Sequence, residues 1–357
     1  MGLSDIIINK IKDEGPISFH TFMDICLYHP AYGYYTTPGD KIGVDGDFFT
    51  SSSLTSSFGA TIARQIEEMW NILGKKDFTI VEYGAGQGLL CHDMLEYLKD
   101  NQQLYNQLRY CIIEKRKGNY QSEKVSSYRS IDEIPGDMDC ILSNELIDNF
   151  PVHQVEMQNE LMEVYVDYDQ QFKELFKPAP SSIRKYFHKL DVTLPEGYRT
   201  EVNLDAIKWI KNIASHLKRG FIITIDYGAT SENLYKPHRS CGTVVCYCKH
   251  RISDDYFYNI GQQDITALVN FSALDHWGQM AGLNTIGITS QGCFLDALGF
   301  KELLRNAIQK QKKDILQMVR EESYISYNLL FDMGAKFQVM IQSKNVEETR
   351  LTGMTYK

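Results

Sequence analysis

The stretch FTIVEYGAGQGLLCHDML, residues 78–95, most constrains the fold of this 357-residue chain. An apolar, β-branched run enters a glycine-rich turn, and apolar residues at helical spacing follow it. This order is typical of the first strand, turn and helix of a doubly wound α/β sheet, whose ligands bind beyond the carboxyl ends of the strands. Gly84, Gly86 and Gly88 allow positive φ and let a ligand approach the main chain closely. The following helix begins with free N–H groups and a partial positive charge.

Strands and helices alternate after this turn, which favours a doubly wound, Rossmann-like α/β domain with a mostly parallel sheet. We expect strands at 79–83, 109–114, 139–143, 221–226, 283–289 and 337–341, and helices at 88–99, 205–218 and 271–281. Two insertions interrupt the alternation, a β-ribbon within about 152–200 and a helical segment at about 300–332. The predicted domains are an N-terminal helical cap at 1–74 and the α/β domain at 75–357.

The residues around the turn distinguish between nucleotide-like cofactors. A dinucleotide site carries G-x-G-x-x-G, but Leu89 stands where its third glycine would be. Glu82 precedes the first glycine by two positions, and Glu114 ends the next strand, where its carboxylate can accept two hydrogen bonds from a ribose diol. This order predicts an S-adenosylmethionine site, and a tight turn without any ligand is the alternative. The predicted cofactor-binding residues are Glu82, Gly84, Ala85, Gly86, Gly88, Glu114 and Asn144.

Carboxylates follow two of the predicted strands on the ligand side of the sheet. The segment SNELIDNFPVHQ places Asn144 and Glu145 directly after a strand, and Asp148 lies one helical turn later. Asp226 ends a further strand in ITIDYG. Asp148 and Asp226 could equally shape or cap turns, since short polar side chains favour such positions.

The loop HPAYGYYTTPGDKIGVDGDFFTSSS is too long and too rich in Gly, Tyr, Ser and Thr for a plain connection. We assign it to the substrate side of the site, with Tyr34, Phe48 and Thr50 as substrate-side residues and Asp47 as a further catalytic candidate. The alternative is a cap whose tyrosines pack on the core.

The composition of the chain indicates which classes of partner and which compartment to expect. The chain has 46 acidic and 37 basic residues and a net charge of −9, which disfavours a nucleic-acid backbone as its main ligand. No apolar run approaches the roughly 20 residues that cross a bilayer, so no membrane insertion is expected. The segment MGLSDIIINKIKDEG lacks the pattern of a secretory signal or a transit peptide, and the scattered cysteines suit a reducing compartment. We therefore expect a cytoplasmic protein.

A possible zinc site occurs in PHRSCGTVVCYCKHR. His238, Cys241, Cys246, Cys248 and His250 are all ligand types for zinc. No C-x-x-C pair occurs, and Cys246 and Cys248, with one residue between them in an apparent strand, point to the same face beside the apolar Val244. We therefore predict no metal.

Several blocks in the same order resemble the MidA-like family of S-adenosylmethionine-dependent methyltransferases, over nearly the whole chain. The blocks are GPISFHTFM, HPAYGYY, GDFFTS, VEYGAGQG, SNELIDNFPVHQVE, IDYG, GTVVCYCKHR, GQQDITALVNF, TSQGCFLDALG and MGAKFQVM. The family turn resembles E-L-G-P-G-R-G, so Ala85 and Gln87 replace its Pro and Arg here. The family's Pro-Glu after GDFxT is also replaced, by SSSL.

The resemblance implies methyl transfer to a nitrogen, because mitochondrial members include an assembly factor that methylates arginine on a respiratory complex I subunit. It implies a protein substrate with an arginine side chain, and carboxylates that orient the guanidinium. The catalytic candidates are Glu145, Asp148, Asp47 and Asp226. Alternatives are a methyltransferase of small molecules, a non-catalytic assembly factor that binds the cofactor, and a nucleotide-dependent oxidoreductase. The sequence predicts no oligomeric state.

Overall fold

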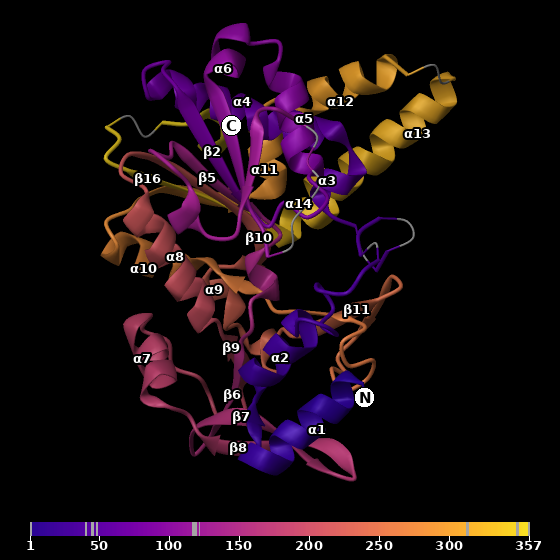
Figure 1. Ribbon diagram of the computed structural model, residues 1–357, viewed down its shortest axis with the longest axis vertical. Coiled ribbons are helices and arrows are strands. Elements are labelled where there is room, and N and C mark those ends of the chain that lie inside the picture. The colour runs from indigo at the N-terminus through magenta and orange to yellow at the C-terminus, as the bar shows by residue number, and fades with distance from the viewer. Residues whose placement is uncertain are drawn as a thin grey trace. The chain divides into compact units, whose positions relative to one another are not determined.

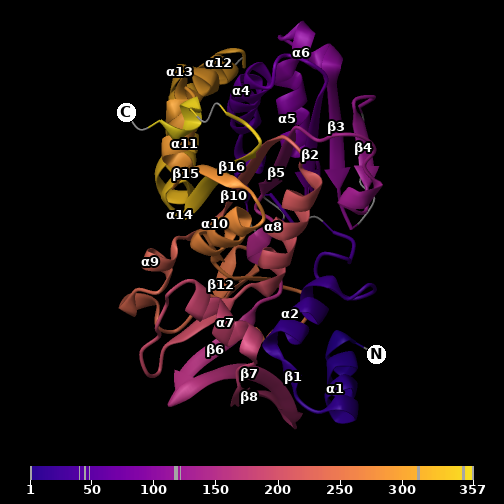
Figure 2. The same ribbon diagram turned by 90° about the vertical axis from the view of Figure 1, so that its left-hand side faces the viewer.

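The computed structural model describes residues 2–39, 41–43, 46–47, 49–115, 120, 122–311, 314–347 and 350–355. Its contacts divide the chain into two compact units (Figures 1 and 2). Unit 1 comprises residues 1–49, 147–209 and 228–276, and unit 2 comprises residues 50–146, 210–227 and 277–357. The predicted domain boundary between residues 74 and 75 remains a prediction, since contact density measures compactness and not independent folding.

Unit 2 contains the α/β sheet, and its strand order confirms the doubly wound class. The order is β15-β16-β10-β5-β2-β3-β4; β4, β3, β2, β5 and β10 run parallel, and β16 is antiparallel to both of its neighbours. The last two residues of β10, Gly228 and Ala229, belong to unit 1, where they pair with the short strand β14. The strands are β2 Phe78–Tyr83, β3 Leu108–Ile113, β4 Val125–Tyr128, β5 Cys140–Asn144, β10 Gly220–Ala229, β14 Val269–Asn270, β15 Asn284–Ser290 and β16 Phe337–Lys344.

Helices cover this sheet because their apolar residues recur on one side. In α4, apolar side chains at helical spacing are fully buried, and they pack with those of α5, α11 and α12 against the strands. The helices and short helical turns are α3 Ser51–Leu54, α4 Ser56–Ile72, α5 Leu89–Leu98, α6 Gln102–Gln107, η1 Ile131–Glu133, α8 Leu204–His216, α10 Phe271–Met280, α11 Gln291–Ala297, α12 Phe300–Gln309, α13 Ile315–Ser326, the π-helical segment η4 Tyr327–Asp332, α14 Met333–Lys336 and η5 Thr352–Met354. Sequence periodicity did not indicate α6 or β4.

Unit 1 contains the predicted β-ribbon in a small antiparallel sheet, β1-β7-β6-β9, with β8 paired to β7. A second sheet has the order β12-β11-β13. Apolar residues of α1 and α2 form one core with residues of β7 and β13. The elements are α1 Leu3–Glu14, β1 Ile17–Ser18, α2 Phe19–Tyr28, η2 Ile147–Asn149, β6 His153–Gln158, β7 Glu160–Asp169, β8 Gln171–Pro178, α7 Ser181–Lys189, β9 Arg199–Val202, α9 Ser231–Leu234, η3 Pro237–Arg239, β11 Val245–Cys248, β12 Arg251–Ser253 and β13 Asp264–Thr266.

The register of the parallel strands brings the predicted site residues of unit 2 to one edge of the sheet. Tyr83, the last residue of β2, is opposite Ile113 on one side and Ser143 on the other. Asn144 is opposite Ile225 in β10. The carboxyl ends of four parallel strands therefore meet at this edge, which is where ligands bind in open α/β sheets.

Candidate active site

The glycine turn after β2 holds three backbone conformations that glycine adopts most easily. The φ angles are +70° at Gly84, +53° at Gly86 and +77° at Gly88. The amide of Gly84 donates to the carbonyl of Ile113 at 3.0 Å, and the amide of Gly88 donates to the carbonyl of Ala85 at 2.8 Å. These bonds fix the turn against β3 and start α5 at a defined position.

The surroundings of the three glycines differ in a way that favours a ligand. A β-carbon on Gly84 would lie 2.7 Å from a methyl carbon of Leu146, and one on Gly88 would lie 2.7 Å from the ring of Tyr120. A β-carbon on Gly86 would meet no heavy atom within 4 Å among the residues that the structure describes. Two glycines are thus required by close packing, whereas the third leaves open space above the backbone.

Glu114 follows β3 directly and contacts the turn. Its Oε1 atom accepts a hydrogen bond from the Gly86 amide at 2.7 Å, and the hydroxyl of Tyr120 donates to the Gly86 carbonyl at 3.2 Å. Burial raises the pKa of Glu114, while the Gly86 amide lowers it. A carboxylate has about four acceptor positions, so Glu114 keeps acceptors for the hydroxyls of a ribose.

Glu82 lies deeper than the other predicted cofactor-binding residues. Only 2% of it is exposed, and one carboxylate oxygen accepts a hydrogen bond from the Tyr110 hydroxyl at 2.7 Å. Burial raises the pKa of Glu82 to about 7, against a lowering by the Tyr110 hydrogen bond. Its part in cofactor binding remains a prediction.

Glu145 stands at the end of β5 with φ of +53°, a conformation that a residue with a β-carbon rarely adopts. Such a backbone costs on the order of 1–3 kcal/mol and occurs preferentially at functional sites. Its Oε1 atom accepts hydrogen bonds from the Ser51 amide at 2.8 Å and the Asn144 side chain at 3.2 Å. Burial raises the pKa of Glu145 to about 7, and the charge of Asp226 adds to this rise.

Asn144 and Asp226 flank Glu145 with different roles in the local structure. The Oδ1 atom of Asn144 is buried without a hydrogen-bond partner among the described residues, so it can accept a hydrogen bond from a ligand. Asp226 is fully buried and accepts hydrogen bonds from the amides of Leu146 at 3.1 Å and Tyr227 at 2.8 Å. These contacts hold the turn after Glu145, and a catalytic role for Asp226 remains a prediction.

Two other predicted residues belong to unit 1. Asp47 accepts hydrogen bonds from the hydroxyl of the buried Tyr34 at 2.7 Å and from the amide of Lys249 at 2.6 Å. The backbone carbonyl of Asp148 accepts a hydrogen bond from Ala267 at 3.0 Å. Tyr34 and Asp47 therefore lie in contact, as part of a network that ties the Tyr/Gly-rich loop to the segment after β11.

Thr50 and Phe48 complete the predicted set. Thr50 belongs to unit 2, is buried, and begins α3, where its amide donates to the Ser53 hydroxyl at 3.0 Å. These contacts give Thr50 a structural role as the residue that caps the start of α3. Phe48 lies outside the described residues. The substrate-side assignments of Tyr34, Phe48 and Thr50 stay predictions.

A buried acid in unit 1 was not among the predicted site residues. Asp264, in β13, accepts hydrogen bonds from the Tyr35 hydroxyl at 2.9 Å and from the Asn149 side chain at 3.1 Å. Burial raises its pKa to about 7, against lowering by these two donors. A charged residue directly before the mostly apolar run ITALV was the signal in the sequence. The contacts of Ser51 and Tyr120 with the site had no such signal.

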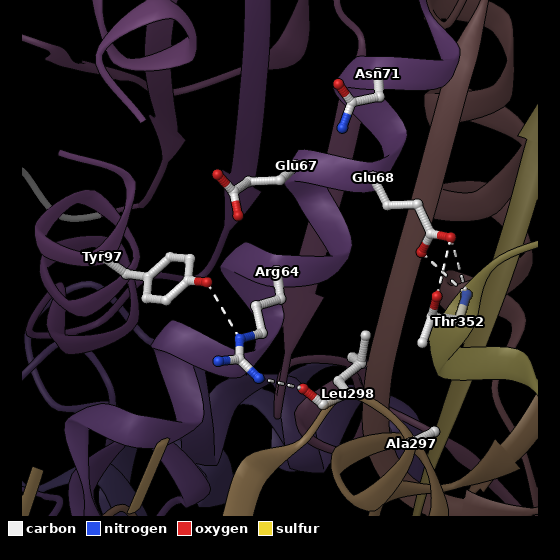
Figure 3. Close-up of a pocket in the computed structure, with 8 residues that line it drawn as sticks. All are labelled: Arg64, Glu67, Glu68, Asn71, Tyr97, Ala297, Leu298 and Thr352. Atoms are coloured by element: carbon white, nitrogen blue, oxygen red, sulfur yellow. Dashed lines mark hydrogen bonds between the residues drawn. The ribbon is translucent and has the colours of Figure 1, made fainter. Parts of the chain in front are cut away.

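A shallow hollow of about 510 Å³ occurs elsewhere in unit 2, over α4, α5 and the segments near residues 297 and 352 (Figure 3). Arg64 in its wall donates to the Tyr97 hydroxyl at 3.2 Å and the Leu298 carbonyl at 3.1 Å. Glu68 accepts hydrogen bonds from the Thr352 amide and hydroxyl. These groups bond to one another, so the hollow does not compete with the strand-end site as a cofactor site.

Within the described ranges, no three His, Cys, Asp or Glu side chains converge as a metal ion would require. No helix in the same ranges combines the length and the hydropathy that crossing a membrane demands.

Comparison with known proteins adds independent findings. A family of S-adenosyl-L-methionine-dependent methyltransferases matches residues 61–289. The mitochondrial protein arginine methyltransferase NDUFAF7 homolog of Caenorhabditis elegans is 28% identical over 94% of this chain and 85% of that protein, and the human NDUFAF7 protein is 26% identical over 93% and 81%. The crystal structure of a protein from Burkholderia thailandensis, bound to S-adenosyl-homocysteine, has a TM-score of 0.87 and 27% identity, covering 98% of this chain and 94% of its own.

These similarities confirm the predicted family resemblance, the α/β fold class and the predicted cofactor. They contradict the predicted cytoplasmic location, since the curated relatives are named mitochondrial. That prediction rested on the scattered cysteines and on the N-terminal segment. The segment forms α1 and buries Leu3, Ile7 and Ile11 in the core of unit 1. Its composition therefore reflects packing and carries no information about the compartment.

Proposed function

Because the chain belongs to the family of S-adenosyl-L-methionine-dependent methyltransferases, we propose that it methylates a nitrogen of an arginine side chain in a protein substrate. The names of its relatives from worm and human support this acceptor, because both are called protein arginine methyltransferases. The observation that carries the proposal is Glu145, a carboxyl with a raised pKa and a positive φ beside the glycine turn.

The residues at the strand ends fit the cofactor. The open space over Gly86 admits a ligand to the backbone, and Glu114 can accept hydrogen bonds from a ribose. The unpartnered Oδ1 atom of Asn144 suits an ammonium donor. When bound, S-adenosyl-L-methionine supplies an electrophilic methyl group on a sulfonium. Ala85 and Gln87, which differ from the family pattern, leave these contacts available, since the contacts use other residues.

An arginine guanidinium is a poor nucleophile while it is protonated, so the protein must orient it and relieve its charge. Glu145 is suited to both tasks. Its second oxygen, Oε2, keeps acceptor positions for N–H groups of the guanidinium, because the Ser51 and Asn144 hydrogen bonds both use Oε1. With a pKa of about 7, it can also accept the proton that leaves the attacking nitrogen. The fixed amide of Ser51 on Oε1 keeps the carboxylate in one orientation.

Asp226 acts in this scheme as a positioning residue. Its bonds to the amides of Leu146 and Tyr227 fix the strained turn that presents Glu145. Because a misplacement of about 1 Å can reduce an enzymatic rate about a hundredfold, we expect the turn to matter as much as the carboxylate. Asp47 and Asp148 in unit 1 remain further candidates for contact with the acceptor.

The test is transfer of labelled methyl groups to arginine-containing peptides and to intact candidate proteins, with lysine variants of the same peptides as controls. Wild-type protein should label the arginine peptides, and Glu145→Gln should reduce the rate at least about a hundredfold while calorimetry shows unchanged cofactor affinity. Labelling of small molecules but of no peptide would instead identify a small-molecule methyltransferase. Tight cofactor binding without turnover on any acceptor would identify a non-catalytic assembly factor.

A further inference from the structure

Helix α13 and the π-helical segment after it expose an apolar surface that the active site does not use. Six large apolar side chains along this stretch are between 55% and 74% exposed. In Figure 1 the helix lies beside α12 at the edge of unit 2, and Arg305 of α12 binds Glu322 of α13 at 2.7 Å. We call this surface the α13 face; it comprises Ile315, Leu316, Val319, Tyr324, Tyr327 and Phe331.

The exposed stripe is opposite to the stripe that packs on the protein. Met318, Ile325 and Leu329 point inward and contact the core of unit 2. On a helix at the surface of a protein, the side that faces the solvent is expected to be polar. Here it repeats Leu316, Arg320 and Tyr324 at intervals of four residues, followed by Tyr327 and Phe331. Aromatic residues and Arg are enriched at protein–protein interfaces, where they carry much of the binding energy.

The size of the α13 face corresponds to half of a stable dimer interface. From typical side-chain areas and the exposed fractions, the six side chains present on the order of 500 Å² of apolar surface. A standard interface buries about 800 Å² per partner, of which about 56–65% is apolar. The apolar share of such an interface is therefore about the area that this face offers.

The charges on the helix favour a protein partner over a lipid surface. Asp314, Glu321 and Glu322 outnumber Arg320 among the described residues of this stretch, and an anionic leaflet would repel them. Arg320 and Glu321 are neighbours of opposite charge. In an antiparallel pair of identical helices, this order is reversed in the second copy, so each Arg320 lies within about 3 Å, measured along the helix axis, of the other copy's Glu321.

We propose that the α13 face binds a second copy of this chain, with the two α13 helices antiparallel across a two-fold axis near residues 321–322. This register sets Leu316 of one copy beside Tyr327 of the other, and Val319 beside Tyr324. Each contact occurs twice, because the two-fold axis makes the interface self-complementary. The proposal concerns assembly and is independent of the methyl acceptor.

The experiment is sedimentation velocity of the full chain from about 1 to 100 µM, a range that detects micromolar dimers. Wild-type protein should sediment as a particle of twice 41.1 kDa. Leu316→Glu and Tyr327→Glu should each weaken the dimer at least tenfold. Met280→Glu is the matched control, because Met280 is an exposed apolar residue of unit 2 outside the face, and it should leave the dimer intact. Calorimetric binding of the cofactor verifies that each variant is folded.

A charge exchange tests the antiparallel arrangement. Arg320→Glu alone should weaken the dimer, since it brings a negative charge close to Glu321 of the other copy, and the double variant Arg320→Glu, Glu321→Arg should restore it. A wild-type monomer at about 100 µM would overturn the proposal, as would a dimer that Leu316→Glu leaves unchanged. A monomer that binds vesicles through the face would also overturn it, in favour of a lipid surface.

Discussion

The glycine turn of unit 2 and the tyrosine–aspartate cluster of unit 1 are organised in opposite ways. The glycine turn is one continuous segment, residues 84–88, and its shape depends on the positive φ angles of its three glycines. The cluster comprises Tyr34, Tyr35, Asp47, Asn149 and Asp264, which three distant segments bring together through side-chain hydrogen bonds. The turn depends on missing side chains, whereas the cluster depends on side chains that are buried and paired.

This difference determines which kind of change each region tolerates. The turn should fail when a β-carbon is added, even where the added atom meets no protein atom. The cluster should fail when charge or a hydrogen bond is altered, and its failure should depend on pH. Substitutions that separate these responses test the comparison.

The largest expected effect is at Gly86. Gly86→Val should reduce the affinity for S-adenosyl-L-methionine at least about a hundredfold, because its side chain would fill the open space over the turn. It also places a β-branched residue at φ of +53°, a strain of about 1–2 kcal/mol. Isothermal titration calorimetry with the cofactor, beside NADH as a negative ligand, measures the loss.

Gly74→Val separates the two effects of Gly86→Val, the backbone strain and the filling of the open space over the turn. Gly74 also has positive φ, at +98°, and no heavy atom of the described residues lies within 4 Å of its would-be β-carbon. It should therefore lower the melting temperature similarly but leave the affinity unchanged. If both variants lost the cofactor equally, the space over Gly86 would not be the binding site.

A smaller effect, in stability, is expected from Asp264→Asn in the cluster. The folded pKa of Asp264 is about 7, above its ordinary value of 3.8. Between these values the folded protein holds a proton that the unfolded chain has released, so this group makes stability fall as pH rises. Removing the carboxyl should remove that fall. The slope of the free energy of unfolding against pH should then change by about 1.4 kcal/mol per pH unit between pH 5 and 7. Urea unfolding at several pH values measures the difference from wild type.

Tyr35→Phe provides the opposite control. The Tyr35 hydroxyl bonds to the Asp264 carboxylate and lowers its pKa. Removing the hydroxyl should therefore raise the pKa further and extend the loss of stability to higher pH. If the free energy of unfolding had the same slope against pH in wild type, Asp264→Asn and Tyr35→Phe, the Asp264 carboxyl would be charged throughout the range from pH 5 to 7.

The sequence predicted the turn well because its information is local. Three glycines at alternate positions can be recognised without knowing the fold, and the predicted strands 79–83 and 139–143 agree with β2 and β5 within one residue. The cluster could not be predicted in the same way. Asp264 follows Tyr35 by 229 positions, and the segments meet through the tertiary packing of unit 1, in which both α2 and η2 contact β13. The strained Glu145 was predicted as a candidate, but its contact with Ser51 required the fold.

The smallest expected effect is at Tyr120, where the turn does depend on a side chain. Tyr120→Phe removes the hydroxyl bond to the Gly86 carbonyl and keeps the ring beside Gly88. A single exposed hydrogen bond contributes about 0.5–1.5 kcal/mol, so cofactor affinity should fall about two- to tenfold. Tyr120→Ala removes the ring as well and should cost more, because the turn then loses its packed neighbour. If Phe and Ala were equally harmful, the hydroxyl alone would hold the turn, and the glycine turn would depend on paired side chains as the unit 1 cluster does.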